Sequence, residues 1–331
     1  EWSPQKSDST SSVSPGDKSK HESALTIIKG ISIAESADPE VQIDNNDFSL
    51  LGVGIDLCNT ATVTANRFSN MRVYGILAET AVQNLFIGPK NQFRVCSDIG
   101  IKVRKGTAIL SGNTFAVCDC AIELADMDEF KVTGNTIGAS EIALRIQNCH
   151  TNTTSSDPVF QVEYNEVRDF DVGLRMETTT GIVKIDTNTF QSSHQDATAI
   201  VLHKESTTTQ IIGNTMEMEN GTAIDVGEQS SEIVIEDNSL TNSACGVNIQ
   251  PLTECKMLGN TVKSTKLATR IAGSASARLE RNTFEETVIA VSVEGTCVDH
   301  NEVRIDSNTF RSAVITVRGG AQPEISGNKF K

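Results

Sequence analysis

The stretch from residue 211 to residue 226 reads IIGNTMEMENGTAIDV, and the stretch from 235 to 249 reads IEDNSLTNSACGVNI. In both, an aliphatic residue stands three positions before an asparagine and a large apolar residue stands two positions after it. A small residue followed by alternating apolar residues comes eight or nine positions after the asparagine. Alternation of this kind, without any longer helical stripe, indicates β-strands. Each unit therefore predicts three short strands.

The same unit recurs from about residue 24 to the last residue. Its asparagine occurs thirteen times, at spacings of 20 to 30 residues: Asn46, Asn66, Asn91, Asn113, Asn135, Asn165, Asn188, Asn214, Asn238, Asn260, Asn282, Asn308 and Asn328. Units of about 23 residues can stack their strands in parallel, one turn about every 4.8 Å. We therefore predict an all-β fold, a parallel β-helix of about 13 rungs over residues 24–331. We expect the asparagine at a corner, because it tolerates left-handed backbone and can stack on its neighbours.

Residues 1–23 are rich in serine and have almost no apolar spacing, which predicts a disordered N-terminal tail or linker. The whole chain of 331 residues carries 28 Lys and Arg against 43 Asp and Glu, a net charge of −15. This balance argues against a nucleic-acid partner, since phosphate binding needs a basic stripe. The mean hydropathy is −0.20, and no apolar run reaches the roughly 20 residues of a membrane span.

These units resemble the right-handed parallel β-helix repeats (PbH1-type) of the pectin-lyase-like superfamily. That superfamily contains pectate lyases, polygalacturonases, phage tailspikes and mannuronan epimerases, and also non-enzymatic repeat proteins. The resemblance covers residues 24–331 and implies a right-handed coil. Its repeats encode a core and not a chemistry, so function must be sought on the surface. The polygalacturonase-like Asn-Thr-Asp and Gly-His-Gly set and the pectate-lyase-like Trp-x-Asp-His and Arg-x-Pro-x-x-Arg elements are absent.

Phase within the repeat predicts which outward side chains stack on one another. On the strand that follows the small residue, it predicts a charged patch across about five rungs: Lys102, Arg104, Glu123, Arg145, Arg175, Glu177 and His203. In the family's lyases and hydrolases the polysaccharide lies along one outer sheet face, which makes this patch a candidate ligand-binding groove. Alternating charges on stacked strands also hold register without any ligand. An enzyme should gather these residues in a cleft with shifted pKa values, whereas a scaffold should keep them flat and paired.

The longest repeat carries an insertion over residues 147–158. Insertions on solenoids commonly serve as binding loops, so His150 and Asp157 are further candidates for ligand binding. Cys149 and His150 stand near Asp157, but no tetrahedral Cys/His spacing completes a metal set, and we predict no metal site. The corner histidines His150, His194 and His300 lie too far apart to share one substrate as acid and base.

Two further rows keep phase with the asparagine. Two positions before it, an acidic row appears: Asp44, Glu163, Asp186, Glu236, Glu280 and Asp306. Oxygen-rich rows can hold Ca²⁺, but apolar residues interrupt this one, so we favour a solvated face and predict no cofactor. Five positions after their asparagines, Cys96 and Cys118 are expected to stack. Parallel Cβ atoms about 4.8 Å apart exceed the usual disulfide separation of about 3.8 Å, which predicts two thiols.

From these patterns we expect a non-catalytic binding or scaffold module that presents a sheet face and the 147–158 loop to a polysaccharide or protein partner. The alternatives are a polysaccharide lyase, glycoside hydrolase or uronate epimerase, and a structural rod of a surface or virion assembly. Sequons occur at Asn152 and Asn220, but a chain rich in Asn and Thr produces such triplets by chance; we expect an extracellular or cell-surface location. Phe330 and Lys331 end within a repeat, so we expect an open rung that could pair with a second copy as a homo-oligomer.

Overall fold

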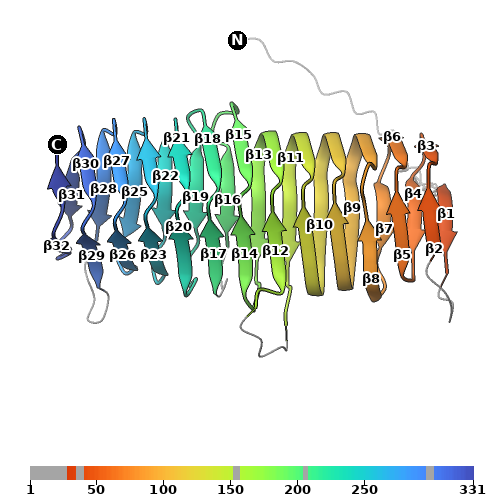
Figure 1. The fold of residues 1–331 in the computed structure, drawn as a ribbon, viewed down its shortest axis with the longest axis horizontal. Coiled ribbons are helices and arrows are strands. Elements are labelled where there is room, and N and C mark those ends of the chain that lie inside the picture. The colour runs from red at the N-terminus through yellow and green to blue at the C-terminus, as the bar shows by residue number, and fades with distance from the viewer. Residues whose placement is uncertain (1–27, 35–40, 152–156, 204–207, 296–301) are drawn as a thin grey trace, which may run out of the picture.

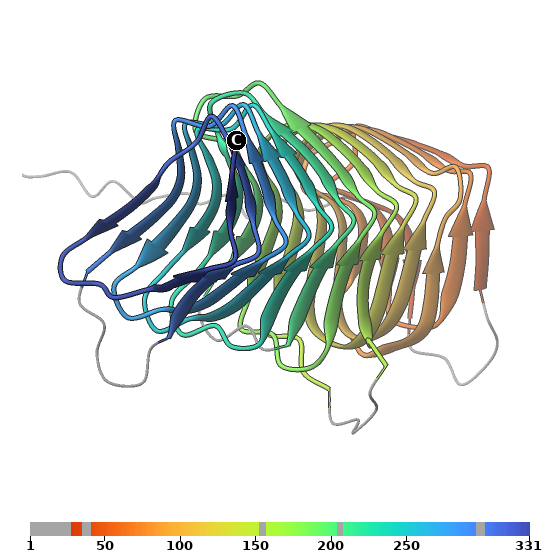
Figure 2. The same ribbon diagram turned by 60° about the vertical axis from the view of Figure 1, so that its left-hand side comes forward.

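A computed structural model describes residues 28–34, 41–151, 157–203, 208–295 and 302–331, and every regular element in these ranges is a β-strand. The strands pair in parallel with the equivalent strands of the next turn (Figure 1). The chain is a right-handed parallel β-helix, as predicted, and its thirteen corner asparagines bound about 12 turns. Figure 2 shows the successive turns stacked along one long axis.

Three parallel sheets, which we name A, B and C, form the walls. Sheet A begins near the small residue of each repeat and contains β1 (Lys29–Ile33), β4 (Val53–Leu57), β7 (Tyr74–Ala78), β16 (Thr198–Leu202), β19 (Thr222–Val226), β22 (Cys245–Ile249), β25 (Leu267–Ala272), β28 (Ile289–Glu294) and β31 (Ile315–Arg318). Sheet B precedes the asparagine and contains β2 (Val41–Asp44), β5 (Ala61–Thr64), β8 (Val82–Ile87), β12 (Phe160–Glu163), β14 (Val183–Asp186), β17 (Thr209–Ile212), β20 (Ile233–Glu236), β23 (Glu254–Leu258), β26 (Ser276–Glu280), β29 (Val303–Asp306) and β32 (Glu324–Ser326).

Sheet C follows the asparagine and contains β3 (Asp47–Ser49), β6 (Arg67–Met71), β15 (Thr189–Ser192), β18 (Thr215–Met218), β21 (Ser239–Thr241), β24 (Thr261–Lys263), β27 (Thr283–Glu285), β30 (Thr309–Arg311) and β33 (Lys329–Phe330). Four long strands bend around corners and belong to more than one sheet: β9 (Gln92–Ser111), β10 (Thr114–Thr133), β11 (Thr136–Gln147) and β13 (Glu166–Glu177).

The core contains a ladder of phenylalanine rings that points inward from sheet C. Phe48, Phe68, Phe93 and Phe115 stack with ring centroids 5.0, 4.6 and 4.6 Å apart. The small residues of sheet A face this ladder: a Cβ atom on Gly75 would lie 2.7 Å from the ring of Phe93. The small residue of each repeat therefore makes room for the aromatic ring of the opposite wall.

The corner asparagines form a second ladder, as predicted, and Asn165 shows its bonding. The side chain of Asn165 is buried, and its Oδ1 accepts hydrogen bonds from the backbone nitrogen (3.0 Å) and Nδ2 (2.9 Å) of Asn135. Its Nδ2 donates to the carbonyl oxygen of Val132 (2.9 Å) and to Oδ1 of Asn188 (2.9 Å). Side-chain bonds between successive asparagines run from Asn46 to Asn328, so each corner is bonded to the corners above and below.

The prediction that the asparagine itself adopts the left-handed backbone was wrong. The left-handed residue is the one before it, and these residues differ widely in type: Asn45, Ala65, Lys90, Gly112, Gly134, Tyr164, Thr187, Gly213, Asp237, Gly259, Arg281, Ser307 and Gly327. This turn sends the asparagine side chain inward, where its amide satisfies buried backbone groups. The asparagine is therefore needed for its buried amide and not for its backbone freedom.

A second left-handed position, between sheets C and A, contains two β-branched residues. Val95 has φ 55° and is 44% exposed, while Val117 has φ 58° and is 55% exposed. Left-handed backbone is rare for β-branched residues and costs them about 1–2 kcal/mol, whereas asparagine tolerates it. We expect Val117→Asn to raise the free energy of unfolding by about 1 kcal/mol, measured by urea denaturation.

The matched control for this prediction is Val288→Asn. Val288 is 71% exposed and does not have a positive φ. Its replacement should therefore change stability by less than about 0.5 kcal/mol. A lower urea midpoint for Val117→Asn than for the native chain would contradict the assignment of strain to this corner.

Several sequence-based predictions fall outside the described residues, namely the tail (1–23), Asn152 and His300. Within the described ranges, no helix is long and apolar enough to cross a lipid bilayer.

Candidate functional site

The charged patch predicted from repeat phase lies on the outer face of sheet A. Lys102 of β9 is the register partner of Glu123 of β10, and Glu123 is the partner of Arg145 of β11. Arg145 in turn pairs in register with Arg175 of β13. Arg104, Glu177 and His203 stand two residues further along their own turns. Sequence phase alone therefore predicted the neighbours on this face correctly.

The centre of this patch is a buried carboxylate between two cations. Glu123 is only 7% exposed, and it lies 3.3 Å from Nζ of Lys102 and 3.0 Å from the guanidinium of Arg145. Burial, the largest single influence on Lys102, lowers its pKa, but the charges of Glu123, Tyr74 and Glu79 and a hydrogen bond to Glu123 raise it on balance. The ammonium of Lys102 also lies 5.5 Å from the ring centroid of Tyr74, within range of a cation–π contact. These charges therefore neutralise one another.

The other members of the patch are also paired. The Nε atom of Arg175 lies 2.7 Å from Oε1 of Glu177, and its guanidinium lies 3.0 Å from Nε2 of His203. Nε of Arg104 donates to Asp126 at 2.7 Å, and this hydrogen bond together with the charge of Asp126 raises the pKa of Arg104. The charged side chains of this patch are therefore paired with neighbouring charges.

One carboxyl near the patch was not singled out from the sequence. Burial raises the pKa of Asp98, and the negative charge of Glu123 raises it further, while the positive charges of Lys102 and Arg145 oppose the shift. A carboxyl that holds its proton more tightly is a feature of acid catalysis. Asp98 is nevertheless exposed at the corner between sheets C and A, and sequence pattern offered no signal for it, because corner residues vary freely in type.

The predicted loop candidates lie at the corner between sheets A and B. Nδ1 of His150 lies 2.7 Å from Oγ1 of Thr180 on the next turn, while Cys149 is buried in the core. Burial raises the pKa of Cys149 to about 12. Asp157 is exposed. It follows residues 152–156 in the sequence, and those residues lie outside the described ranges. Adjacent Cys149 and His150 therefore point to different environments and do not form a pair of metal donors.

Two members of the acidic row predicted on the strand before the asparagine, Glu163 and Asp186, are paired with lysines. Glu163 lies 3.0 Å from Nζ of Lys131 and 3.6 Å from Nζ of Lys184, and Lys184 also contacts Asp186 at 2.7 Å. Burial, the largest influence on Asp186, raises its pKa, but hydrogen bonds from Lys184 and Thr187 lower it on balance. Throughout the described ranges, no group of three or more His, Cys, Asp or Glu side chains is placed to hold a metal ion.

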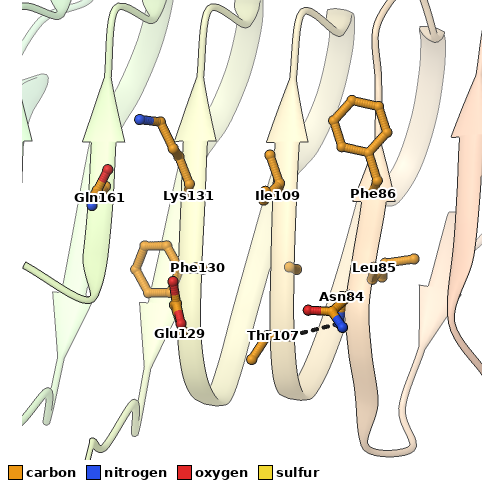
Figure 3. Close-up of a pocket in the computed structure, with 10 residues that line it drawn as sticks. Asn84, Leu85, Phe86, Thr107, Ile109, Glu129, Phe130, Lys131 and Gln161 are labelled. Atoms are coloured by element: carbon orange, nitrogen blue, oxygen red, sulfur yellow. Dashed lines mark hydrogen bonds between the residues drawn. The ribbon is translucent and has the colours of Figure 1, made fainter. Parts of the chain in front are cut away.

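A hollow of about 190 Å³ lies on the outer face of sheet B, where the sequence predicted no site. Figure 3 shows Phe86, Ile109, Lys131 and Gln161 in a row across four neighbouring strands, β8, β9, β10 and β12. Ile109 is 45% exposed and Phe86 is half-buried, so both present apolar surface to solvent. Polar groups complete the lining: Asn84, Thr107, Glu129, Lys131 and Gln161.

Two bulges flank the hollow and account for its shape. The register between β8 and β9 shifts between Val82 and Leu85, and the register between β10 and β9 shifts between Met127 and Glu129. In the first bulge Asn84 has a φ of 54°, and its backbone nitrogen donates to Oγ1 of Thr107 at 2.7 Å. Bulges bend a strand locally and re-aim its side chains, and they are frequent beside binding sites.

The hollow also adjoins the predicted binding loop. Nε2 of Gln161, at the rim, donates to the carbonyl oxygen of Pro158 at 2.9 Å, which ties the loop's C-terminal end to β12. Our sequence reading assigned the phenylalanines mostly to inward positions, and Phe86 is an exception. The available signal was the unbroken apolar run Leu85-Phe86-Ile87, because strict alternation must send its middle residue outward.

Comparisons with known proteins support the fold. The family model described as "Right handed beta helix region" matches residues 172–330, and the one described as "Periplasmic copper-binding protein (NosD)" matches residues 11–199. The structure is similar to a crystal structure of a mutant of the periplasmic alginate epimerase AlgG, with a TM-score of 0.59 and 11% identity over 88% of this chain and 75% of that one. A double mutant of that epimerase gives a TM-score of 0.50 and 12% identity at the same coverage. No curated protein matches the chain.

Proposed function

This chain belongs to the family described as periplasmic copper-binding protein (NosD), and from that premise we propose that it is a non-catalytic, polysaccharide-binding β-helix of the cell envelope. The envelope location is proposed because the family and the structural neighbours are both described as periplasmic. Polysaccharide is proposed as the ligand because of the surface chemistry of the hollow on sheet B.

The observation that carries the proposal is the outward pair Phe86 and Ile109 within a polar rim. Sugar rings present one apolar face and an edge of hydroxyl groups, so they stack on aromatic surfaces while their hydroxyls bond to polar side chains. In the hollow, Glu129 can accept hydrogen bonds from hydroxyls, Lys131 can donate, and the Gln161 amide can do both. Because Phe86, Ile109, Lys131 and Gln161 lie in register on four adjacent turns, a linear polymer can lie along the rod and contact several of them at once.

The absence of catalysis is proposed from the charge pairing on sheet A. Glu123 is neutralised by Lys102 and Arg145, and Arg175 is held by Glu177. A glycosidase needs two carboxyls that flank one bond, and a lyase or epimerase needs a base within reach of a sugar proton. We propose that this patch serves mainly to hold register between turns, while its role in ligand binding stays a prediction.

A glycan-binding array combined with a turnover assay tests the proposal. Uronate-containing and neutral polysaccharides would be offered with and without Ca²⁺ to the native chain and to Phe86→Ala, with Leu252→Ala as a control at an exposed site (58% exposed). We expect binding without product release or unsaturated-uronate absorbance. Phe86→Ala should weaken binding about tenfold, equivalent to about 1.4 kcal/mol, and Leu252→Ala should not.

The remaining outcomes are also informative. Loss of binding in Arg145→Ala/Arg175→Ala, with Phe86→Ala unaffected, would move the site to the patch on sheet A. Polymer cleavage or epimerisation would overturn the non-catalytic assignment. Failure to bind any glycan would contradict the polysaccharide proposal and favour a protein partner for the same face.

A further inference from the structure

One asparagine of the chain is followed directly by a glycine, and it lies at the corner between sheets C and A. Asn220 and Gly221 form the connection between β18 and β19, and Asn220 is exposed with a φ of 66°. In the whole sequence no other asparagine precedes a glycine. The function proposed above makes no use of this corner, so either proposal can fail without the other.

The backbone nitrogen of Gly221 is not engaged in a hydrogen bond. The nitrogens on either side of it are engaged: that of Asn220 donates to the carbonyl oxygen of Asn242 at 3.3 Å. The nitrogen of Thr222 donates to the carbonyl oxygen of Ala197 at 2.8 Å. Among the residues that the structure describes, no acceptor is bonded to the nitrogen between them. Because glycine has no side chain, a group that approaches this nitrogen also meets little steric resistance.

A cation lies against the side-chain amide of Asn220. Nζ of Lys266, two turns further along the rod, donates a hydrogen bond to Oδ1 of Asn220 at 3.2 Å. A positive charge at a carbonyl oxygen stabilises the negative charge that develops there when a nucleophile adds to the carbon. Nδ2 of Asn220 makes no hydrogen bond within the described ranges, so no contact holds this nitrogen against departure.

The asparagine at the same corner of the next turn is held in place. Asn242 also has a left-handed backbone, with a φ of 57°, but it is followed by the buried Ser243. Its Nδ2 donates to Oε1 of Glu217 at 3.0 Å. The ladder asparagines are held as well: the amide of Asn214, for example, is buried and bonded to neighbouring turns. Asn220 therefore differs from the other asparagines in its contacts as well as in its sequence.

We propose that Asn220 is a site of spontaneous covalent modification, converted through a cyclic imide to aspartate and isoaspartate. The nitrogen of Gly221 attacks Cγ of Asn220: an N–Cγ bond forms, and the N–H proton passes to solvent. The Cγ–Nδ2 bond then breaks, and Nδ2 takes up a proton and leaves as ammonia. Water opens the imide at either of its two carbonyl carbons, which places a carboxylate where the amide stood. No electron is transferred, and Lys266 stabilises the negative charge on Oδ1 during the attack.

The isoaspartate product does not fit this corner as asparagine does, because its main chain runs through the former side chain and is one carbon longer. The corner is tight: a Cβ atom on Gly221 would lie 2.2 Å from the carbonyl oxygen of Ala197. The carbonyl oxygen of Gly221 also accepts hydrogen bonds from the nitrogens of Ala244 (2.8 Å) and Cys245 (3.2 Å). The modification therefore disturbs contacts with both neighbouring turns.

Timed incubation of the folded, full-length chain tests the site. Trypsin cleaves after Lys204 and Lys256, so Asn220 and Asn242 fall in one peptide, and fragmentation mass spectrometry measures both conversions in the same sample. We expect Asn220 to convert at least about tenfold faster than Asn242, because its nucleophile is adjacent and unbonded. Conversion should also speed up as the pH rises, since the attacking nitrogen must lose its proton. Equal rates at the two positions, or a faster rate at Asn242, would overturn the site.

Matched lysine variants test the contribution of Lys266. Lys266→Met should slow conversion of Asn220 by about three- to tenfold, less than the loss of a buried oxyanion donor, because Lys266 is exposed to solvent and salt. Lys266→Arg should keep close to the native rate, since it keeps the charge. Lys263→Met is the control, because Lys263 is exposed and contacts Glu286 (3.8 Å) instead. It removes the same charge from the chain and should leave the rate unchanged.

Unfolding in urea separates the effect of the folded corner from that of the dipeptide. Once the turns have separated, Lys266 no longer lies beside Asn220, so the native chain and Lys266→Met should convert at equal rates. A folded Lys266→Met as fast as the folded native chain would contradict the role of the lysine. Should that variant fail to fold, the salt dependence of the native chain decides: conversion should slow at high salt, and an unchanged rate contradicts stabilisation by the ammonium.

Discussion

Replacement of Asn165 by alanine is expected to lower the free energy of unfolding by about 3–5 kcal/mol, the largest effect of any single polar substitution considered in this chain. The variant removes the acceptor for the backbone nitrogen and Nδ2 of Asn135. It also removes the donor to Val132 and to the next asparagine, Asn188. Each buried polar group left without a partner costs about 1–3 kcal/mol, and partial relaxation keeps the total below the sum. Equilibrium urea denaturation measures the loss.

Asn328→Ala provides the control at the end of the same ladder. Asn328 is half-buried; its Oδ1 accepts from the backbone nitrogen and Nδ2 of Asn308, and its Nδ2 donates to the carbonyl oxygen of Ile305. We expect a loss of about 1 kcal/mol there, because water can reach the groups left unpaired. Equal losses of unfolding free energy at positions 165 and 328 would show that burial does not explain how much each asparagine stabilises the fold.

Replacement of Phe93 by alanine is expected to cost about 3–5 kcal/mol. Phe93 is 1% exposed and stacks on Phe68 and on Phe115, each at a centroid distance of 4.6 Å. Truncation removes both contacts and leaves a cavity between two turns whose backbones are held apart by the parallel ladder, so the walls cannot collapse into it. Thermal and urea unfolding would both report the change.

Phe93→Leu separates the loss of volume from the loss of the ring. Leucine fills much of the cavity and occurs at the equivalent position of another turn, as Leu240. We expect a cost below about 1.5 kcal/mol. A loss as large as that of alanine would mean that the stacking geometry, and not the filled volume, stabilises the ladder.

The fold could be predicted in detail because its information is local and repeated. Each repeat carries the same three marks, the small residue, the aliphatic residue and the asparagine with its apolar follower, and thirteen copies leave little freedom in register. The same phase predicted that Lys102, Glu123 and Arg145 would be neighbours, and that Cys96 and Cys118 would stack, which the register confirms. Neighbours one turn apart follow from the period alone, because a solenoid contacts only adjacent turns.

Other features of the surface departed from the sequence prediction for physical reasons. The left-handed corner residue was misplaced by one position because many residue types tolerate it when both neighbours are anchored, as Ala65 and Thr187 show. The hollow at Phe86 was missed because it depends on two bulges, at Asn84 and beside Met127, and a one-residue slip reverses which side chains face outward.

By itself the sequence determined the architecture of this protein, its three strands per turn, its asparagine ladder and the neighbours within the charged patch on sheet A. It could do so because burial of a periodic pattern has a single solution when every turn must match the next. Only the tertiary structure decided which outward charges neutralise one another and where bulges open a hollow on sheet B. Those features depend on side-chain reach, burial and local breaks in register, which differ from turn to turn while the repeat stays the same.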